Sequence, residues 1–478
     1  MSTRGPSGTG APEAGAAPSP PVAGPPSEPI ETDVLILGGG VSGMACAAAL
    51  GDHAIVLERE DRPGGLVRGI SLDGWWFDHV LHLLYFPNDA TEQRVKALPG
   101  LQLEPCPPVA WVESRSGRAR FPIQNNLRDL PTETIVSCIA DLAAAAAQAG
   151  HREPANYREL LLDAFGPSLC EEFFFPYNEK MWRRPLTRLA TRGFHWNISR
   201  PDFRQVLEGA LPASERTAAY NSRGWYPRPR PGGRRGMEGL SDALAGQVRA
   251  LRLEHEVTGI HLGQRRVTAR HRGRTFEFRY RRRLVNTLPL PVALGLIEDL
   301  PAALRDAARG LHVNRVLSAC FAIRGPRPRD TGHWRYYSDL ELCFTRLIFM
   351  HAFDPDTAPE AGWGLMAEIP EHGEDPLRPP AEVMDTVRRD LARAGFPAAG
   401  SEIVGEKLLV NPYGYVVFET GVLERASQAL AFLRERDVEP LGRYGRWEYS
   451  SMGQVMRDGF AVGDALHAEL AGGGPRRA

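Results

Sequence analysis

The order of apolar and polar residues along the chain predicts alternating strands and helices. Residues 33–37 form an almost continuously apolar run, which is typical of a parallel strand buried on both faces. A glycine-rich turn and the small, helix-favouring residues 44–50 follow, and residues 54–58 form a second apolar run. This β–turn–α–β order is the unit from which doubly wound sheets are built, so the beginning of the chain predicts an α/β fold.

The middle of the chain has a different pattern. Between residues 130 and 225, Ala, Leu and aromatic residues recur with helical spacing, which predicts a mainly helical domain. Residues 253–280 alternate apolar and polar positions, which predicts antiparallel strands. We interpret their arginine-rich part, Arg265 to Arg283, as the solvent face of a hairpin rather than as a nucleic-acid patch, because apolar residues alternate with the arginines. Residues 283–289 predict another buried strand, which ends in a proline turn.

Composition and charge exclude several classes of protein. The 57 basic and 58 acidic residues of the 478-residue chain argue against a protein held on nucleic acid by an overall basic field. No apolar run reaches the roughly 18 residues of a membrane span, and residues 1–30 lack the features of a signal peptide. The 6 cysteines are dispersed without a CxxC motif, and the 13 histidines form no close ligand pair. We therefore expect a cytoplasmic protein with no metal centre and with neither a membrane nor a nucleic-acid partner.

The glycine turn after the first strand has the spacing of a dinucleotide-binding site. Gly38, Gly40 and Gly43 form the pattern GxGxxG between a strand and a helix. The first glycine permits a tight turn, the second lets the backbone approach a pyrophosphate, and the third lets helix and strand pack closely. Glu58 ends the second strand, where a carboxylate can accept hydrogen bonds from ribose hydroxyls. This context favours a nucleotide site over a glycine turn without a ligand.

Two further segments suggest which dinucleotide binds. One is Arg59 to Arg68, which carries the pair Gly64-Gly65 shortly after Glu58, and the other is Gly442 to Met452 near the end of the chain. Both resemble FAD enzymes of the superfamily of amine oxidases, protoporphyrinogen oxidases and UDP-galactopyranose mutases. In that superfamily the first segment wraps the FAD pyrophosphate and the second covers the flavin. The cofactor-binding residues that the resemblance implies are Gly38, Gly40, Ser42, Gly43, Glu58, Arg59, Gly64, Gly65, Leu66, Val257, Gly442, Arg443 and Met452.

Four motifs resemble UDP-galactopyranose mutase more specifically. In chain order they span Tyr177 to Trp182, Tyr337 to His351, Pro412 to Tyr415 and Gly442 to Met452. In the mutases the aromatic residues of the first motif contact uridine, and an Arg and tyrosines of the others bind the substrate diphosphate. The substrate-binding residues that the resemblance implies are Tyr177, Trp182, Arg346, Tyr413, Tyr415 and Tyr449, with His82 and Arg346 as catalytic residues.

The residue types leave other roles open. Tyr177 and Trp182 suit a stacking clamp for a base, and they equally suit the core of a helix. Arg346 lies in an apolar, strand-like run, where it needs an anionic partner. Either a ligand diphosphate or a structural carboxylate meets that need. His82 can act as a general base or only pack beside the flavin ring.

The chain also departs from the mutase pattern. The glycine that precedes the first flavin-side histidine of the mutases is absent before His82, and Tyr85 replaces their second histidine. Gly453 replaces the Asp of the last motif, and residues 121–126 resemble mutase-like flavoproteins of sugar-processing gene clusters. The second diphosphate arginine of the mutases should lie between Trp182 and Gly232. The candidates there are Arg200, Arg204 and Arg223.

The resemblance implies a sugar-nucleotide pyranose/furanose mutase that requires reduced FAD. In the mutases, N5 of the reduced flavin attacks the anomeric carbon and expels the nucleoside diphosphate, which arginine and tyrosines stabilise. NAD(P)H or a reductase is the expected reductant. The alternative is an FAD-dependent oxidase or dehydrogenase that takes a hydride from an amine or alcohol, such as a sugar or secondary metabolite. A binding protein with a degenerate flavin fold is a third hypothesis.

Together these patterns predict a Rossmann-like FAD-binding domain, a mainly helical substrate domain and an additional antiparallel sheet. The predicted FAD-binding parts are residues 31–100, 228–320 and 405–470. The helical substrate domain is expected at 101–227 and the substrate-domain sheet and helix at 321–404. A disordered Pro-, Ala- and Gly-rich tail at 1–30 and a short tail at 471–478 complete the predicted layout.

Overall fold

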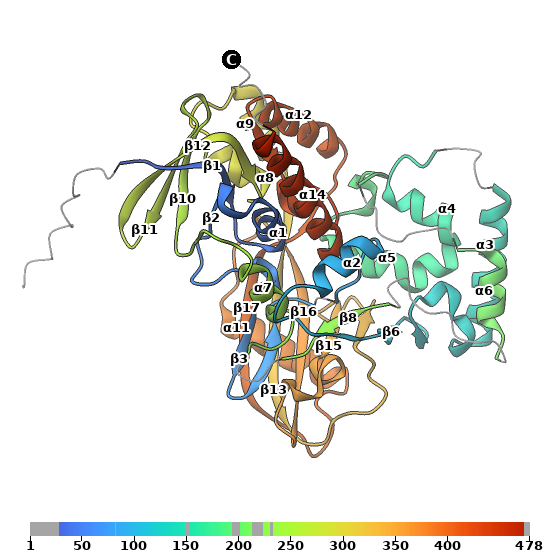
Figure 1. Cartoon of the computed structure of the whole chain (residues 1–478). Coiled ribbons are helices and arrows are strands. Elements are labelled where there is room, and N and C mark those ends of the chain that lie inside the picture. Colours follow the sequence, from blue (N-terminus) through green and yellow to red (C-terminus); the bar gives the residue numbers. More distant parts are fainter. Residues whose placement is uncertain are drawn as a thin grey trace, which may run out of the picture.

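Two large sheets and a group of helices make up the computed structural model of the chain (Figure 1). The structure describes residues 28–81, 83–148, 153–193, 201–212, 223–229 and 233–472. The predicted α/β class, with an additional antiparallel sheet, is confirmed. Most of the two predicted tails lies outside the described residues. Across the described ranges, none of the helices combines the length and the apolar character needed to traverse a bilayer.

The first sheet contains the predicted β–turn–α–β unit. Its strand order is β10-β11-β12-β1-β2-β9, with β18 paired to β12. The pairs of β1 with β2 and β12 are parallel, whereas β10, β11 and β12 pair antiparallel. The strands are β1 (Ile30–Leu37), β2 (Ala54–Leu57), β9 (Leu251–Arg252), β10 (Glu256–His261), β11 (Arg266–His271), β12 (Arg274–Asn286) and β18 (Val438–Pro440).

Helices cover both faces of this sheet, as the side chains of β1 require. Val34 and Ile36 pack in one apolar cluster with α1 and α14, and Leu35 and Leu37 pack in another with α8, α9 and α12. Alternate residues of a strand point to opposite faces, so a strand buried on both faces is apolar throughout. The helices are α1 (Val41–Leu50), α8 (Leu290–Gly295), α9 (Ala302–Arg309), α12 (Val422–Arg434) and α14 (Met452–Ala471).

The predicted hairpin is also confirmed. The arginine-rich segment forms the antiparallel pair β11–β12. Several of its arginines pair with nearby carboxylates, as in Arg270 with Glu256 and Arg272 with Glu254, and these four side chains are largely exposed. This face therefore has the character of a solvated sheet surface.

The second sheet has the strand order β17-β13-β16-β15-β14-β6-β7 and is antiparallel except between β14 and β6. One face packs on α11 (Pro380–Arg393), and the other shares an apolar cluster with α1, β4 (Trp75–Asp78) and α7 (Glu238–Ala245). The strands are β6 (Ala110–Glu113), β7 (Arg118–Arg120), β13 (Val313–Arg324), β14 (Trp334–Tyr337), β15 (Arg346–Phe349), β16 (Gly362–His372) and β17 (Glu402–Val416).

Two of the predicted domain boundaries are wrong. The boundary at 320/321 falls inside β13 and the boundary at 404/405 falls inside β17, and both strands lie wholly in the second sheet. An apolar run has the same pattern whichever sheet it joins, because hydrogen-bonded partners distant in the sequence decide the sheet. Strands β13 and β17 pair along almost their whole length, so neither contributes to the sheet of the glycine turn.

The helices predicted between residues 130 and 225 form a separate layer, which Figure 1 shows to one side of the sheets. They are α3 (Thr132–Gln148), α4 (Tyr157–Leu169), a π-helical turn (Cys170–Phe174), α5 (Phe175–Trp182) and α6 (Phe203–Ala210). The remaining elements are β3 (Gly69–Leu72), β4 (Trp75–Asp78), α2 (Asp89–Lys96), β5 (Leu103–Pro105), β8 (Trp225–Pro227), α7 (Glu238–Ala245), α10 (Met350–Phe353) and α13 (Gly442–Gly445).

Helices α1 and α14 approach each other closely because glycines line α14 where they meet. A Cβ on Gly459 would lie 2.5 Å from the Ser42 carbonyl oxygen, and one on Gly463 would lie 2.5 Å from the Cys46 carbonyl oxygen. Backbone atoms of a buried helix cannot move aside as a side chain can, so a larger residue would push the helices apart.

Gly459→Ala should therefore lower the free energy of unfolding by about 1–3 kcal/mol. Gly295→Ala is the matched control, because a Cβ there meets no atom within 4 Å and Gly295 also lies in a helix. Thermal unfolding of both variants tests the expectation. Equal melting temperatures for the two variants would contradict it.

Candidate active site

The three glycines of the first turn meet the demands expected of them. Gly38 has φ +101°, and a Cβ there would lie 2.4 Å from Thr287 Oγ1. A Cβ on Gly43 would lie 2.3 Å from the Gly38 carbonyl oxygen, so this glycine lets α1 start against the strand. Gly40 differs, because a Cβ there would meet no atom within 4 Å. The turn is thus closed by packing at its first and third glycines and open at the second, where a phosphate must approach.

Glu58 lies beside this turn, as predicted. Its Oε2 accepts a hydrogen bond from the Gly39 N–H (2.8 Å) and its Oε1 accepts one from the Glu60 N–H (3.0 Å). The residue is only 8% exposed. These two backbone donors orient the carboxylate and leave further lone pairs on both oxygens for ribose hydroxyls.

The Gly64-Gly65 segment lies against the first turn. The Gly64 N–H donates to the Gly39 carbonyl oxygen (2.8 Å), and a Cβ on Gly65 would lie 3.5 Å from Gly40 Cα. Leu66 continues this segment in a short 3-10 turn. The two glycine loops therefore lie side by side. Arg59 is largely exposed and bonds Glu60, so its side chain extends away from the loops.

Two residues of α7 that sequence reasoning missed support this segment. The fully buried Glu238 accepts hydrogen bonds from Arg62 (3.0 Å), Arg234 (2.7 Å) and the Gly69 N–H (3.0 Å). Ser241 is also buried, and its hydroxyl has no hydrogen-bond partner among the described residues. A Cβ on Gly64 would lie 2.6 Å from this hydroxyl oxygen. Only an excess of glycine before α7 marked this region in the sequence.

The segment Gly442 to Met452, near the end of the chain, also lies against the first glycine turn. Gly442 has φ +78°, and a Cβ there would lie 2.5 Å from Ser42 Oγ at the start of α1. Met452 begins α14 after a capping box and is 9% exposed. Val257 is partly buried in β10, two residues after His255, whose N–H donates to the Glu58 carbonyl oxygen (2.8 Å).

A second group of residues, here termed the substrate cluster, gathers side chains from four separate parts of the chain. Arg346 in β15 lies directly across from Glu368 in β16 and Tyr336 in β14, and its guanidinium bonds the Glu368 carboxylate. Tyr415 in β17 donates to Glu368 Oε1 (2.7 Å). The members of the cluster are Tyr177, Tyr336, Arg346, Glu368, Tyr415, Arg443 and Tyr449.

The charge states of this cluster follow from burial and from Glu368. Burial opposes the charge of Arg346, but Glu368 and the neighbouring tyrosines together outweigh burial, so the pKa of Arg346 is raised well above its usual value. Burial raises the pKa of Tyr177 and Tyr415 well above the usual range of a phenol, and it also raises the pKa of Tyr336. The tyrosines therefore keep their hydroxyl protons at neutral pH and can donate hydrogen bonds to an anion.

Arg443 of the C-terminal segment Gly442 to Met452 also belongs to the substrate cluster. Its guanidinium carbon lies 4.1 Å from the centre of the Tyr449 ring and 5.8 Å from that of Tyr415. Its Nε and Nη2 are buried and have no hydrogen-bond partner in the described part of the chain. The segment thus contacts the first glycine turn through Gly442 and the substrate cluster through Arg443.

Only some of the predicted substrate residues belong to the substrate cluster. Tyr415, rather than Tyr413, contacts Glu368, whereas the Tyr413 ring lies 6.4 Å from that of Tyr444. Trp182 is fully buried, and its indole N–H donates to Asn178 Oδ1 (3.1 Å). A base cannot stack on a residue with no exposed surface, so the predicted clamp of Tyr177 and Trp182 is not formed by Trp182.

Other predicted residues lie elsewhere. His82 and Arg200 lie outside the described residues. Arg204 is 87% exposed on α6 beside Glu208, and Arg223 is also exposed, so neither belongs to the substrate cluster. Lys180, within the first mutase-like motif, donates to three backbone carbonyls between β14 and β15, and burial lowers its pKa to about 8. That lysine stabilises the loop that precedes Arg346.

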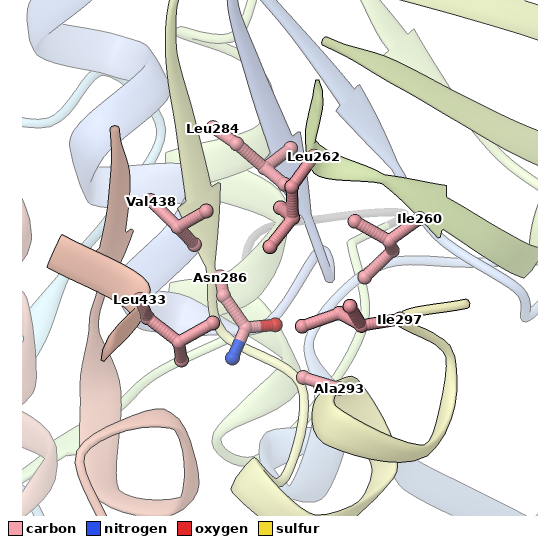
Figure 2. Close-up of a pocket in the computed structure, with 8 residues that line it drawn as sticks. All are labelled: Ile260, Leu262, Leu284, Asn286, Ala293, Ile297, Leu433 and Val438. Carbon is pink, nitrogen blue, oxygen red and sulfur yellow. The ribbon is translucent and has the colours of Figure 1, made fainter. Parts of the chain in front are cut away.

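A small pocket lies between strands β10, β12 and β18 of the first sheet and helices α8 and α12 (Figure 2). Asn286 and seven apolar side chains line it, and it has room for about one water molecule. The Asn286 amide bonds the backbone N–H and carbonyl of Leu288 (3.2 Å each). We interpret this pocket as a small packing gap rather than a ligand site.

Comparison with known families agrees with the geometry. The model of the family described as flavin containing amine oxidoreductase matches residues 41–422. The chain belongs to this family. Membership makes the protein a flavoenzyme, and the loops fit FAD, because Gly40 leaves an approach open and the Ser241 hydroxyl has no partner. The residues that would hold FAD are those of the two glycine loops, Glu58 and the segment that begins at Gly442.

Solved structures of several family branches share the fold. A reduced UDP-galactopyranose mutase matches with a TM-score of 0.80 at 19% identity, over 93% of this chain and 94% of that one. A protein described as a putative protoporphyrinogen oxidase from Exiguobacterium matches with 0.66 at 16%, over 94% and 100%. A wild-type putrescine oxidase bound to putrescine matches with 0.60 at 17%, over 93% and 99%. At these identities the likeness shows a common fold and leaves the reaction open.

A curated relative matches only locally. It is an uncharacterized protein from the nifH2 3' region of Methanothermococcus thermolithotrophicus, 37% identical over 65 residues. The match covers 13% of this chain and 63% of that protein. It adds nothing on activity.

Gly40→Val should empty the cofactor site without harming the fold. Gly40 has φ −74° and ψ 171°, which valine adopts readily, and its side chain would enter the open space where phosphates approach. We expect at least about tenfold weaker FAD binding with an unchanged melting temperature of the apoprotein. Gly43→Ala, which places a Cβ against backbone, should instead lower that temperature. Normal flavin content in Gly40→Val would contradict the assignment.

Proposed function

We propose that this flavoenzyme is a sugar-nucleotide mutase that interconverts pyranose and furanose forms of its substrate. The observation that supports this function is the substrate cluster, in which Arg346, Arg443 and neutral tyrosines meet beside the last flavin-type segment. Guanidinium and phenol groups are the donors that stabilise a departing diphosphate. The fold shared with UDP-galactopyranose mutase supports the same conclusion.

The residues of the chain would divide the work as follows. When bound and reduced, FAD would supply the nucleophilic centre, and the isomerisation leaves its oxidation state unchanged. Tyr415 and Arg346 are fixed by Glu368, so they are pre-organised before a substrate enters. The rings of Tyr177 and Tyr336 lie 5.4 Å apart and shield this pair from water. A nucleotide sugar is the proposed substrate, and NAD(P)H or a reductase is the proposed reductant.

One observation favours a second candidate, an FAD-dependent oxidase or dehydrogenase acting on an amine or alcohol. Arg346 already has a counter-ion in Glu368, so this arginine does not require an anionic substrate. The Arg346 guanidinium carbon also lies 5.8 Å from the centre of the Tyr336 ring, and a ring face of this kind suits recognition of a substrate cation. The oxidative reaction would need a hydride acceptor but no leaving diphosphate.

The redox state of the flavin that activity requires distinguishes the mutase from the oxidase or dehydrogenase. A mutase should convert its sugar nucleotide only after dithionite reduction, whereas an oxidase should consume oxygen as isolated. The measurement is a titration of the reduced protein with UDP, GDP and dTDP, followed by an isomerisation assay on the corresponding sugar nucleotides. Oxygen uptake on a panel of amines and alcohols, with no nucleotide bound, would overturn the mutase proposal.

Arg346→Ala should lower kcat/KM of the mutase at least about 100-fold, because it leaves the Glu368 carboxylate uncompensated beside the substrate and disturbs the position of Tyr415. Its flavin absorbance per polypeptide should remain that of the wild type. Arg324→Ala is the control, since Arg324 lies in the same sheet and is 63% exposed. Normal turnover in Arg346→Ala would remove this residue from the mechanism.

A further inference from the structure

The two arginines of the substrate cluster differ in their counter-ions. Arg346 bonds the carboxylate of Glu368, so their charges cancel. No carboxylate contacts Arg443 among the residues that the structure describes, and its Nη1 donates a long hydrogen bond to the Ser450 carbonyl oxygen (3.5 Å). The uncompensated positive charge of the cluster therefore belongs to Arg443.

The unused nitrogens of Arg443 lie on one edge of the guanidinium. Nε and Nη2 are the two that are buried without a partner, and their N–H bonds point in nearly the same direction. This edge matches two oxygens of a phosphate or carboxylate, which is the bidentate geometry of strong arginine–anion pairs. Leaving both groups unsatisfied in a buried site is costly, so the site is incomplete without an anion.

The surroundings keep Arg443 charged. Burial opposes the charge, but Tyr444, Tyr449 and Tyr415 outweigh burial, so the pKa of Arg443 is raised. The Tyr449 ring, 4.1 Å from the guanidinium carbon, holds one face of the group by a cation–π contact. A ring face stabilises the charge but does not accept the in-plane N–H bonds.

The position of Arg443 allows two anions in principle, the FAD pyrophosphate or a substrate diphosphate. Its neighbour Gly442 touches Ser42 at the first glycine turn, but the Arg443 side chain extends to Tyr449 and Tyr415. Tyr415 in turn bonds Glu368, the counter-ion of Arg346. The side chain thus lies with the substrate cluster, whereas backbone groups and Glu58 form the cofactor cradle.

We propose that Arg443 is the arginine that binds the substrate diphosphate through its Nε–Nη2 edge, and that Arg346 with Glu368 is a neutral pair that positions Tyr415. This assignment rests on the proposed mutase function. It moves Arg443 from the expected cofactor contacts to the substrate. It also supplies a diphosphate arginine without Arg204 or Arg223, which are exposed.

The test compares a nucleoside diphosphate with its nucleoside. Intrinsic tryptophan fluorescence of the reduced holoenzyme is titrated with UDP, GDP and dTDP, and then with the nucleoside of the tightest binder. The ratio of the two Kd values measures recognition of the diphosphate alone. Arg443→Gln should reduce this ratio about 10- to 100-fold, with flavin absorbance per polypeptide unchanged.

Three further variants sharpen the test. Arg204→Gln, on the exposed side of α6, is the control and should leave the ratio unchanged. Arg443→Lys should keep part of the ratio, because it retains the charge but loses the bidentate edge. Adding Glu368→Gln to Arg443→Gln should recover part of the lost ratio, because it frees the charge of Arg346.

Each outcome distinguishes the assignment from the proposed function. Loss of FAD from Arg443→Gln with an unchanged ratio would return this residue to the cofactor and overturn the assignment. An unchanged ratio with FAD retained in both Arg443 variants would also overturn it. Failure of the wild type to bind any of the nucleoside diphosphates would overturn the proposed function first, and the assignment with it.

Discussion

The backbone of the glycine turn at 38–43 is the constraint on which the rest of this structure depends. Three other segments touch it at places where no side chain fits: Gly64 by a hydrogen bond to Gly39, Gly442 against Ser42, and Gly459 against the Ser42 carbonyl. These contacts bring residues from the beginning and end of the chain to one edge of the first sheet. The cradle for FAD is therefore built by close backbone packing, and a single added methyl group can disturb it.

A second constraint is the carboxylate of Glu368 within an otherwise cationic and aromatic cluster. It bonds both Arg346 and Tyr415, so two donors from different strands are oriented by one acceptor. Such a pair is costly to bury but gives a defined arrangement that does not depend on a ligand. The paired Arg346 and Glu368 therefore fix the geometry of the site, whereas two buried N–H groups of Arg443 have no partner among the described residues. The proposed mutase reaction would use both, because its leaving group is charged and must be retained.

Sequence patterns predicted the elements around the first glycine turn well. The strand, the turn, α1 and Glu58 lie within 30 residues of one another, and each has a local signature in glycine spacing or apolar periodicity. The substrate residues were harder, because Tyr177, Arg346 and Tyr415 come from segments far apart in the chain. Glu368 and Ser241 carried no local signal, since one carboxylate or hydroxyl in a strand or helix resembles many others. Trp182 carried a motif but proved to be a buried core residue.

The sequence by itself determined the fold class, the nucleotide turn and the family, because these depend on interactions between neighbouring residues. Only the tertiary structure decided that β13 and β17 join the second sheet, that Tyr415 contacts Glu368, and that Arg443 faces the substrate cluster. The physical reason is that a charge acquires its role from the partner it meets across strands, and strand pairing distant in the sequence selects that partner.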